Sequence, residues 1–248
     1  MPNFLPDLPD TLIHEALSRA PGNELRSGKF DGAESSSALI ANAFGWFLER
    51  PGTLPPLPGV PAGAVEAVDL AAEMRFPWSG GRHPWLDVAI MTHTTLVGVA
   101  ARRYEPFRPA KQTGFADVYD RPVWGPNMAR YTALALQLIE GTADYRSLNA
   151  AQLVKDAYGI RTRASKRALG AVLVYLYAEP AAWASGKPVD AAAKARHRAE
   201  IARFGATVAG DDVVFVPLRW GDLLRQWAQV PALSSHVAAL RARFGDLG

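Results

Sequence analysis

The run at residues 170–177, Gly-Ala-Val-Leu-Val-Tyr-Leu-Tyr, constrains the fold of this chain more than any other feature. After the glycine every residue is apolar or aromatic, and such residues favour strands. A strand without polar alternation is typical of the centre of a sheet that is covered on both faces. The run therefore predicts a sheet with helices on both sides, which is an α/β fold.

Three more strands are predicted to precede this run, over residues 67–76, 85–92 and 95–104. A Ser-Gly-Gly turn at 79–81 separates the first two, and a very short connection at His93 separates the second and third. Connections this short join antiparallel neighbours. We expect these three strands to form an antiparallel meander.

Helical spacing of apolar residues and one further apolar run predict the remaining elements. Residues 50–63 are rich in proline and glycine, so we expect a surface connector that does not divide two domains. The chain thus reads as a single domain, 1–248, with a mixed sheet in which an antiparallel meander is flanked by helices. The predicted helices cover residues 12–19, 38–48, 128–140, 148–158, 189–204, 220–230 and 234–244, and the last strand covers 213–217.

The composition limits the possible classes of function. The 248 residues include no cysteine, so disulfides, thiolate metal sites and cysteine nucleophiles are excluded, and any metal must bind oxygen or nitrogen ligands. No stretch reaches the roughly 20 apolar residues that span a bilayer, and the N-terminus shows no signal pattern. We therefore expect a cytoplasmic protein that does not enter a membrane. The net charge is +3, and the basic residues are locally clustered.

Asp87 is the first candidate for chemistry, because it lies between Leu86 and Val88 in a predicted strand. Successive strand residues point to opposite faces, so the carboxylate should face away from these two apolar neighbours. It is either a solvated residue on an open face or a metal ligand. On the next strand Ala100 and Arg102 share a face, and normal hairpin pairing would put them beside Asp87.

These stretches resemble the PD-(D/E)XK nuclease superfamily, the restriction-endonuclease-like class. Residues 84–87, Pro-Trp-Leu-Asp, resemble its first half-motif. Residues 96–99 resemble the apolar lead-in to its second half-motif, but residues 100–102 read Ala-Ala-Arg where members carry Glu-x-Lys. The order helix, meander, helix, strand is also similar to that core.

More specifically, the chain is similar to a set of uncharacterised bacterial restriction-endonuclease-like proteins. The resemblance runs roughly from Glu24 to Phe215. The stretches that carry it lie at residues 35–39, 86–87, 104–107, 149–155 and 172–177.

The resemblance implies an endonuclease that hydrolyses the phosphodiester bonds of a nucleic acid, DNA rather than RNA, with Mg²⁺ or Mn²⁺. It also implies a role in phage defence and a possible homodimer. Asp87 would be a metal ligand, but Ala100 has no oxygen to serve as the second one. Arg102 keeps the positive charge of the lysine, yet its planar guanidinium is a poor substitute beside water. As written, the site is predicted to be inactive.

Three explanations remain open for the missing ligand. The alanine can be an engineered inactivating substitution, it can reflect a natural loss of activity, or another acid can replace the glutamate. Glu24 is the first candidate acid, because many such nucleases place a carboxylate early in the fold. Glu73 is the second, on the strand face opposite Val68, Leu70 and Met74. Glu105 is the third, although in a regular strand it would face away from Arg102.

Several polar and aromatic residues are candidates for contact with nucleic acid. Gln152 and Lys155 share a helix face, where they could reach a phosphate or simply be solvated. Basic residues can follow a phosphate backbone, or form an ordinary soluble loop. Trp78 and Trp124 lie in predicted loops and are candidates for base stacking. The basic cluster consists of Arg161, Arg163, Lys166 and Arg167.

The main rival to a nuclease is a non-catalytic module that binds nucleic acid or protein on the same fold, with Asp87 structural. A metabolic hydrolase is a third class. The sequence contains no His-x-x-x-His zinc pattern, no Gly-x-Ser-x-Gly elbow and no phosphate-binding glycine loop that ends in Lys-Ser or Lys-Thr.

Overall fold

A single mixed sheet of five strands, in the order β1-β2-β3-β4-β5, organises the chain. The computed structural model describes residues 3–22, 24–78, 80–109, 114–245 and 247–248. The first three strands are antiparallel, whereas β4 runs parallel to β3 and β5 runs parallel to β4. The predicted meander is confirmed. The strands are β1 (Val65–Glu73), β2 (Trp85–Thr92), β3 (Thr95–Arg102), β4 (Gly170–Tyr177) and β5 (Val213–Arg219).

Strand β4 lies between β3 and β5 and is buried on both faces, as its apolar run predicts. Val172 and Val174 pack into one hydrophobic core, and Leu173 and Tyr175 pack into another on the opposite face. The protein therefore has two cores, separated by the sheet.

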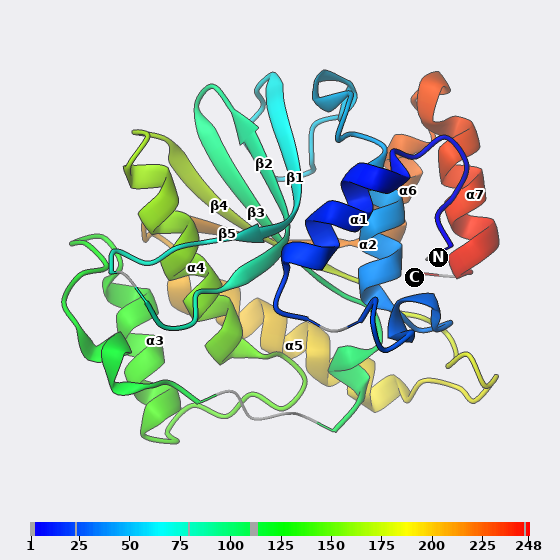
Figure 1. Cartoon of the computed structure of the whole chain (residues 1–248). Coiled ribbons are helices and arrows are strands. Elements are labelled where there is room, and N and C mark those ends of the chain that lie inside the picture. Colours follow the sequence, from blue (N-terminus) through cyan, green and yellow to red (C-terminus); the bar gives the residue numbers. More distant parts are fainter. Residues whose placement is uncertain (1–2, 23, 79, 110–113, 246) are drawn as a thin grey trace.

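Helices cover both faces of the sheet, which gives three α/β/α layers (Figure 1). The first core lies under α1, α2, α6 and α7, and the second lies under α3, α4 and α5. The α/β class and the mixed sheet flanked by helices are therefore confirmed. The helices are α1 (Asp10–Arg19), α2 (Ser36–Gly45), α3 (Ala129–Ile139), α4 (Ala150–Ser165), α5 (Ala191–Val208), α6 (Trp220–Trp227) and α7 (Ser234–Phe244), with short 3-10 turns η1 (Lys29–Asp31), η2 (Pro51–Thr53), η3 (Glu105–Phe107), η4 (Asp117–Asp120) and η5 (Pro231–Leu233).

Helix α4 is longer than predicted, because it continues past Tyr158 to Ser165. Gly159 suggested a helix end, but it serves close packing: a Cβ at this position would lie 2.6 Å from the Cβ of Met74. The sequence Arg161–Arg167 is therefore the last two turns of α4 and the residues after it, and not the soluble loop that the charge run suggested.

A backbone irregularity in β1 changes which face its side chains occupy. Ala71 has φ of 48°, which lies in the left-handed region that a β-strand does not use. As a result Val68 and Leu70 pack into the first core, whereas Met74 packs into the second. The prediction that these three residues share a face is wrong, because the irregularity reverses the alternation.

The connector at residues 50–63 contains only the short η2 turn and crosses the surface. Leu54 and Leu57 are buried in the first core, which also holds Phe44 before the connector and Val68 after it. The connector therefore links two parts of the same core. Among the described residues, no helix is both long enough and apolar enough to span a membrane.

Candidate functional site

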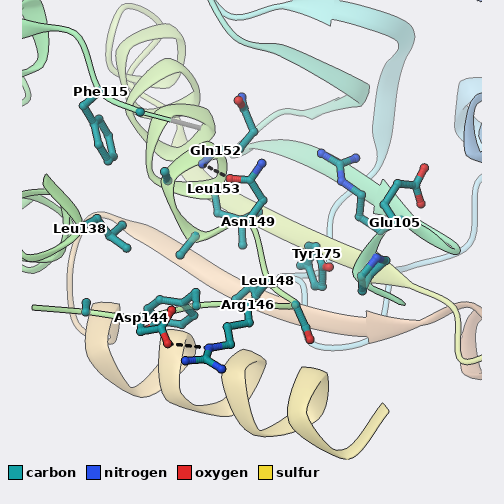
Figure 2. A pocket seen from close by; sticks show the side chains of 18 of the residues that line it. Glu105, Phe115, Leu138, Asp144, Arg146, Leu148, Asn149, Gln152, Leu153 and Tyr175 are labelled. Carbon is teal, nitrogen blue, oxygen red and sulfur yellow. Dashed lines mark hydrogen bonds and ion pairs between the residues drawn. The ribbon is translucent and has the colours of Figure 1, made fainter. Parts of the chain in front are cut away.

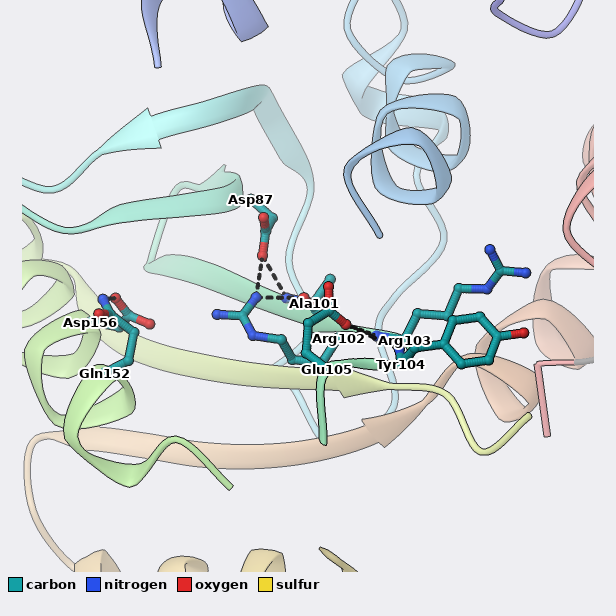
Figure 3. Close-up of polar contacts among 8 residues, drawn as sticks. All are labelled: Asp87, Ala101, Arg102, Arg103, Tyr104, Glu105, Gln152 and Asp156. Carbon is teal, nitrogen blue, oxygen red and sulfur yellow. Dashed lines mark hydrogen bonds and ion pairs between the residues drawn. The ribbon is translucent and has the colours of Figure 1, made fainter. Parts of the chain in front are cut away.

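Asp87 lies where β2 and β3 diverge. Their antiparallel pairing ends at Val88 and Val99, one residue before Asp87 and Ala100 would meet. Beyond that point the Asp87 carboxylate takes over: its Oδ2 accepts hydrogen bonds from Ala101 N–H at 2.7 Å and from Arg102 Nη1 at 3.2 Å (Figure 3). The side chain thus links two separating strands.

Asp87 also marks a change of face within β2. Val88 packs into the first core, but Leu86 packs into the second, over Gly98, where an added Cβ would lie 2.3 Å from Leu86 Cδ1. The prediction that Asp87 faces away from both apolar neighbours is therefore wrong, because Leu86 and Val88 do not share a face. The reversal lies next to the irregularity at Ala71, which falls between the paired residues Leu70 and Ala72.

Arg102 is the cation of the site. Its side chain is 27% exposed, its Nη1 also donates to the Ala101 carbonyl at 2.5 Å, and it lines a cavity described below. Burial lowers the pKa of Arg102, but the carboxylates of Asp87 and Glu105 outweigh burial and raise it above the ordinary arginine value. The guanidinium is therefore permanently charged.

The carboxyl of Asp87 shows the opposite balance. Burial raises its pKa, and the Arg102 guanidinium and the Ala101 N–H offset part of this shift. The carboxylate is thus held by its cationic neighbour rather than by solvent.

Glu105 lies on the same side as Arg102, contrary to the prediction from strand alternation. The strand ends at Arg102, and Glu105 begins η3, so alternation no longer applies. Its Oε2 accepts hydrogen bonds from Arg103 N–H at 2.8 Å and Tyr104 N–H at 3.1 Å. Burial would raise the pKa of Glu105, but the nearby Ser36 hydroxyl, the Arg102 guanidinium and the Arg103 N–H lower it.

Asp156 of α4 is a member of the site that sequence reasoning missed. It is 1% exposed, and its Oδ1 accepts a hydrogen bond from Gln152 Nε2 at 2.9 Å (Figure 3). Burial raises the pKa of Asp156 to about 7, against the lowering effects of Gln152 and Arg102. The available signal was an acid four residues after Gln152 on a helix face that also carries Leu153 and Ala157.

The residues at the site do not fit a Mg²⁺ or Mn²⁺ ion. Ala100 is buried and has no ligand atom, and the Asp87 oxygen nearest to it is bound to a guanidinium and an N–H. In the described part of the chain, no three Asp, Glu, His or Cys side chains converge to hold a metal. Octahedral Mg²⁺ is held by carboxylates together with water, and one paired carboxylate is too few.

The other candidate acids lie in different surroundings. Glu24 is exposed in the loop after α1, where its backbone carbonyl accepts hydrogen bonds from Phe30 N–H and the Ser27 hydroxyl. Glu73 lies at the end of β1 and forms a long ion pair with Arg75, at 3.9 Å. The acids that act on the charge of Arg102 are Asp87, Glu105 and Asp156.

The predicted phosphate contacts of α4 are already engaged. Gln152 donates to Asp156, as described above, whereas Lys155 Nζ donates to the Gly114 carbonyl at 2.6 Å. The Lys155 ammonium also lies 5.1 Å from the ring centroid of Phe115 and 5.2 Å from that of Tyr119. Lys155 therefore fastens the segment at 114–119 to α4.

The four basic residues at the end of α4 divide into two kinds. Arg161 pairs with Asp212 at 3.3 Å, and Arg163 pairs with Asp69 at 3.6 Å. Lys166 and Arg167 are exposed. Since a helix rises about 1.5 Å per residue, Lys166 lies roughly 20 Å along α4 from Gln152. The two sets of predicted nucleic-acid contacts are therefore well separated.

The two tryptophans proposed for base stacking pack against the protein itself. Trp124 is 4% exposed and stacks on Tyr158 with ring centroids 4.0 Å apart, so it does not offer a face to a base. Trp78 is half-buried and packs on Phe76 and Trp124. For Trp124 the stacking prediction is wrong, because the loop folds back onto α4.

A cavity of about 800 Å³ opens beside Arg102, between η3, the start of α4 and the loop that follows α3 (Figure 2). We call it the α4 cavity. Tyr175 of β4 also lines it, and its hydroxyl forms a 2.9 Å hydrogen bond with the fully buried His197 Nε2. Burial lowers the pKa of His197 to about 4, so the imidazole is neutral. Tyr175 is thus held rigidly by a neutral partner.

Glu200 of α5 fixes the loop that forms one wall of the α4 cavity. The carboxylate is 7% exposed and accepts three backbone hydrogen bonds, from Arg146 N–H at 3.0 Å, Ser147 N–H at 2.8 Å and Leu148 N–H at 2.7 Å. This wall is therefore set by an internal anion before any ligand arrives.

In comparisons with protein-family models, curated proteins and solved structures, nothing was found to match this chain.

Proposed function

We propose that this protein is a nucleic-acid-binding module of the restriction-endonuclease class in which an internal ion pair replaces the hydrolytic centre. The observation that carries the proposal is the Asp87 carboxylate, whose Oδ2 is bound by Arg102 and by the Ala101 N–H. A guanidinium thus neutralises the carboxylate that the resemblance assigns to a metal ion.

The fold supports the assignment to this class. A helix precedes an antiparallel meander, a further helix follows it, and the next strand adds in parallel beside β3. This is the order that the resemblance predicts. Asp87 and Arg102 also lie on adjacent strands at the point where those strands separate, so an open cleft adjoins them.

The residue set supports binding rather than hydrolysis. Metal-assisted hydrolysis requires a cation that polarises the phosphate and activates water. Ala100 supplies no ligand, and Arg102 cannot give up a proton at neutral pH. We therefore assign Mg²⁺ or Mn²⁺ only to a form with glutamate at position 100.

Exposed basic residues supply a surface for phosphates. Lys166 and Arg167 lie at the end of α4 without the carboxylate partners that Arg161 and Arg163 have among the described contacts. Phosphate contacts supply most of the non-specific affinity of DNA-binding proteins. DNA is the partner that we propose.

The test combines binding and cleavage. Fluorescence anisotropy with a labelled 20-base-pair duplex should give binding that weakens steeply as salt rises. Plasmid incubated with the protein and either Mg²⁺ or Mn²⁺ should stay intact. Cleavage that disappears in Asp87→Asn would overturn the non-catalytic assignment, and absence of binding to both DNA and RNA would overturn the module itself.

A further inference from the structure

The size of the α4 cavity limits what can enter it. Its volume of about 800 Å³ falls in the range of roughly 300–1,000 Å³ that is usual for sites of small ligands. A double helix is too wide for such a space, whereas one nucleotide that has left the helix is not. The cavity therefore suits a single unpaired unit of a nucleic acid.

Two arginines offer their guanidinium groups to this space. Arg102 lies at the inner end, and only its Nη1 is used by Asp87 and the Ala101 carbonyl. Arg146 lies on the opposite wall, where it pairs with Asp144 at 2.8 Å (Figure 2). Both of these side chains are mostly exposed, and exposed ion pairs are weak. Arg146 can therefore exchange its partner for a phosphate, which guanidinium groups bind in a forked geometry.

The charges of the lining match one phosphate better than a run of phosphates. Three arginines line the cavity, and the carboxylates of Glu105 and Asp144 cancel two of their charges. The net charge of these side chains is thus +1. A long polyanionic strand would need more positive charge, because each phosphate in contact must be neutralised.

An apolar wall completes the cavity. Ile139, at the end of α3, is 50% exposed, although large apolar side chains are normally covered. Leu138 and the half-buried Phe115 line the same space (Figure 2). Nucleobases pack on apolar and aromatic groups with little regard to sequence.

We propose that the α4 cavity holds the unpaired terminal nucleotide of a DNA strand, so that the protein recognises duplexes with a single-stranded overhang. This inference rests on the proposed function, because it names the kind of DNA that the module prefers. The phosphate lies between Arg102 and Arg146, and the base lies against Ile139 and Phe115.

The experiment compares two labelled duplexes of equal length, one blunt and one with a two-nucleotide overhang, by fluorescence anisotropy. The native chain should bind the overhang about tenfold more tightly. Ile139→Glu should remove this preference and keep the affinity for the blunt duplex. Leu136→Glu is the matched control, since Leu136 is 47% exposed on the same helix but does not line the cavity.

The outcomes separate this inference from the proposed function. Equal affinity for the two duplexes would overturn the inference and leave the binding module standing, whereas no binding to either duplex would overturn the module. Thermal unfolding monitored by circular dichroism establishes that both variants are folded. Arg146→Ala is a second variant on the opposite wall, and it should remove the preference as well. An overhang preference that survives in both cavity variants would also overturn the inference.

Discussion

Arg102 Nη1 lies 3.2 Å from Asp87 Oδ2, at the point where the ladder between β2 and β3 has ended. The same oxygen accepts the Ala101 N–H at 2.7 Å, so one carboxylate oxygen links two strands through a main-chain and a side-chain donor. In the nuclease class that the sequence resembles, a metal ion would act on this carboxylate. Here an arginine of the chain does so, and the consequences can be measured.

Loss of Arg102 should destabilise the fold. In Arg102→Ala the carboxylate of Asp87, which is only 30% exposed, loses its charged partner. We expect the free energy of unfolding to fall by about 1–3 kcal/mol. Urea unfolding of Arg102→Ala, Asp87→Ala and the double variant measures this. The double variant should cost less than the sum of the two single ones. Strict additivity would show that the pair does not interact.

Restoring a glutamate alone should not restore hydrolysis. In Ala100→Glu the Arg102 guanidinium still neutralises Asp87, so we expect no cleavage of plasmid with Mg²⁺. The double variant Ala100→Glu, Arg102→Lys supplies both missing groups and should nick plasmid in a Mg²⁺-dependent way. Adding Asp87→Ala should abolish that nicking. Cleavage by the single variant would contradict the assigned role of Arg102 as the resident cation.

Asp156 should make stability depend on pH. Its pKa is raised from 3.8 to about 7 in the folded state, so the folded protein retains a proton that the unfolded chain releases. Stability should be greatest below pH 4, fall as the pH rises from about 4 to 7, and then level off, with a total loss on the order of 4 kcal/mol.

Asp156→Asn provides the comparison, because the amide cannot ionise and still offers an oxygen to Gln152. Urea unfolding between pH 4 and pH 8 should show a shallower slope for this variant and a greater stability than the native chain at pH 8. Parallel slopes for the two proteins would exclude a raised pKa at Asp156.

Glu200 should support the wall of the α4 cavity. In Glu200→Ala, the N–H groups of Arg146, Ser147 and Leu148 lose a buried acceptor, and two of these residues are themselves buried. We expect a loss of about 3 kcal/mol in urea unfolding. Glu200→Gln keeps one good acceptor and should lose less. The same stability in all three proteins would show that water replaces the carboxylate.

The basic end of α4 should control the salt dependence of DNA binding. Replacing Lys166 and Arg167 by alanine should reduce the slope of log affinity against log salt by about 1.8, which is roughly 0.9 for each lost phosphate contact. Arg161→Ala is the control, because its guanidinium is paired with Asp212. An unchanged slope in the double variant would place the DNA elsewhere.

The main elements of the fold could be predicted from local patterns. The apolar run of β4 and the short connections of the meander determine buried and antiparallel strands whatever surrounds them. The end of α4 could not be predicted in this way. Gly159 breaks a helix by local propensity, but here the close contact with Met74 requires it.

The site divides along the same line. Strand spacing alone brings Arg102 beside Asp87, because residues two apart share a face and a hairpin joins the strands. It does not bring Asp156 or Glu105 there. Asp156 comes from a helix that packs on the sheet, and Glu105 turns toward Arg102 only because the strand stops at Arg102.

The sequence by itself determined the strand order of the meander, the buried central strand and the replacement of a glutamate by Ala100. Only the tertiary structure decided that Arg102 neutralises Asp87, that Asp156 keeps a proton near pH 7 and that a cavity opens beside them. The physical reason is range: periodicity and turns act between near neighbours in the chain, whereas burial and charge pairing depend on every element that packs around a group.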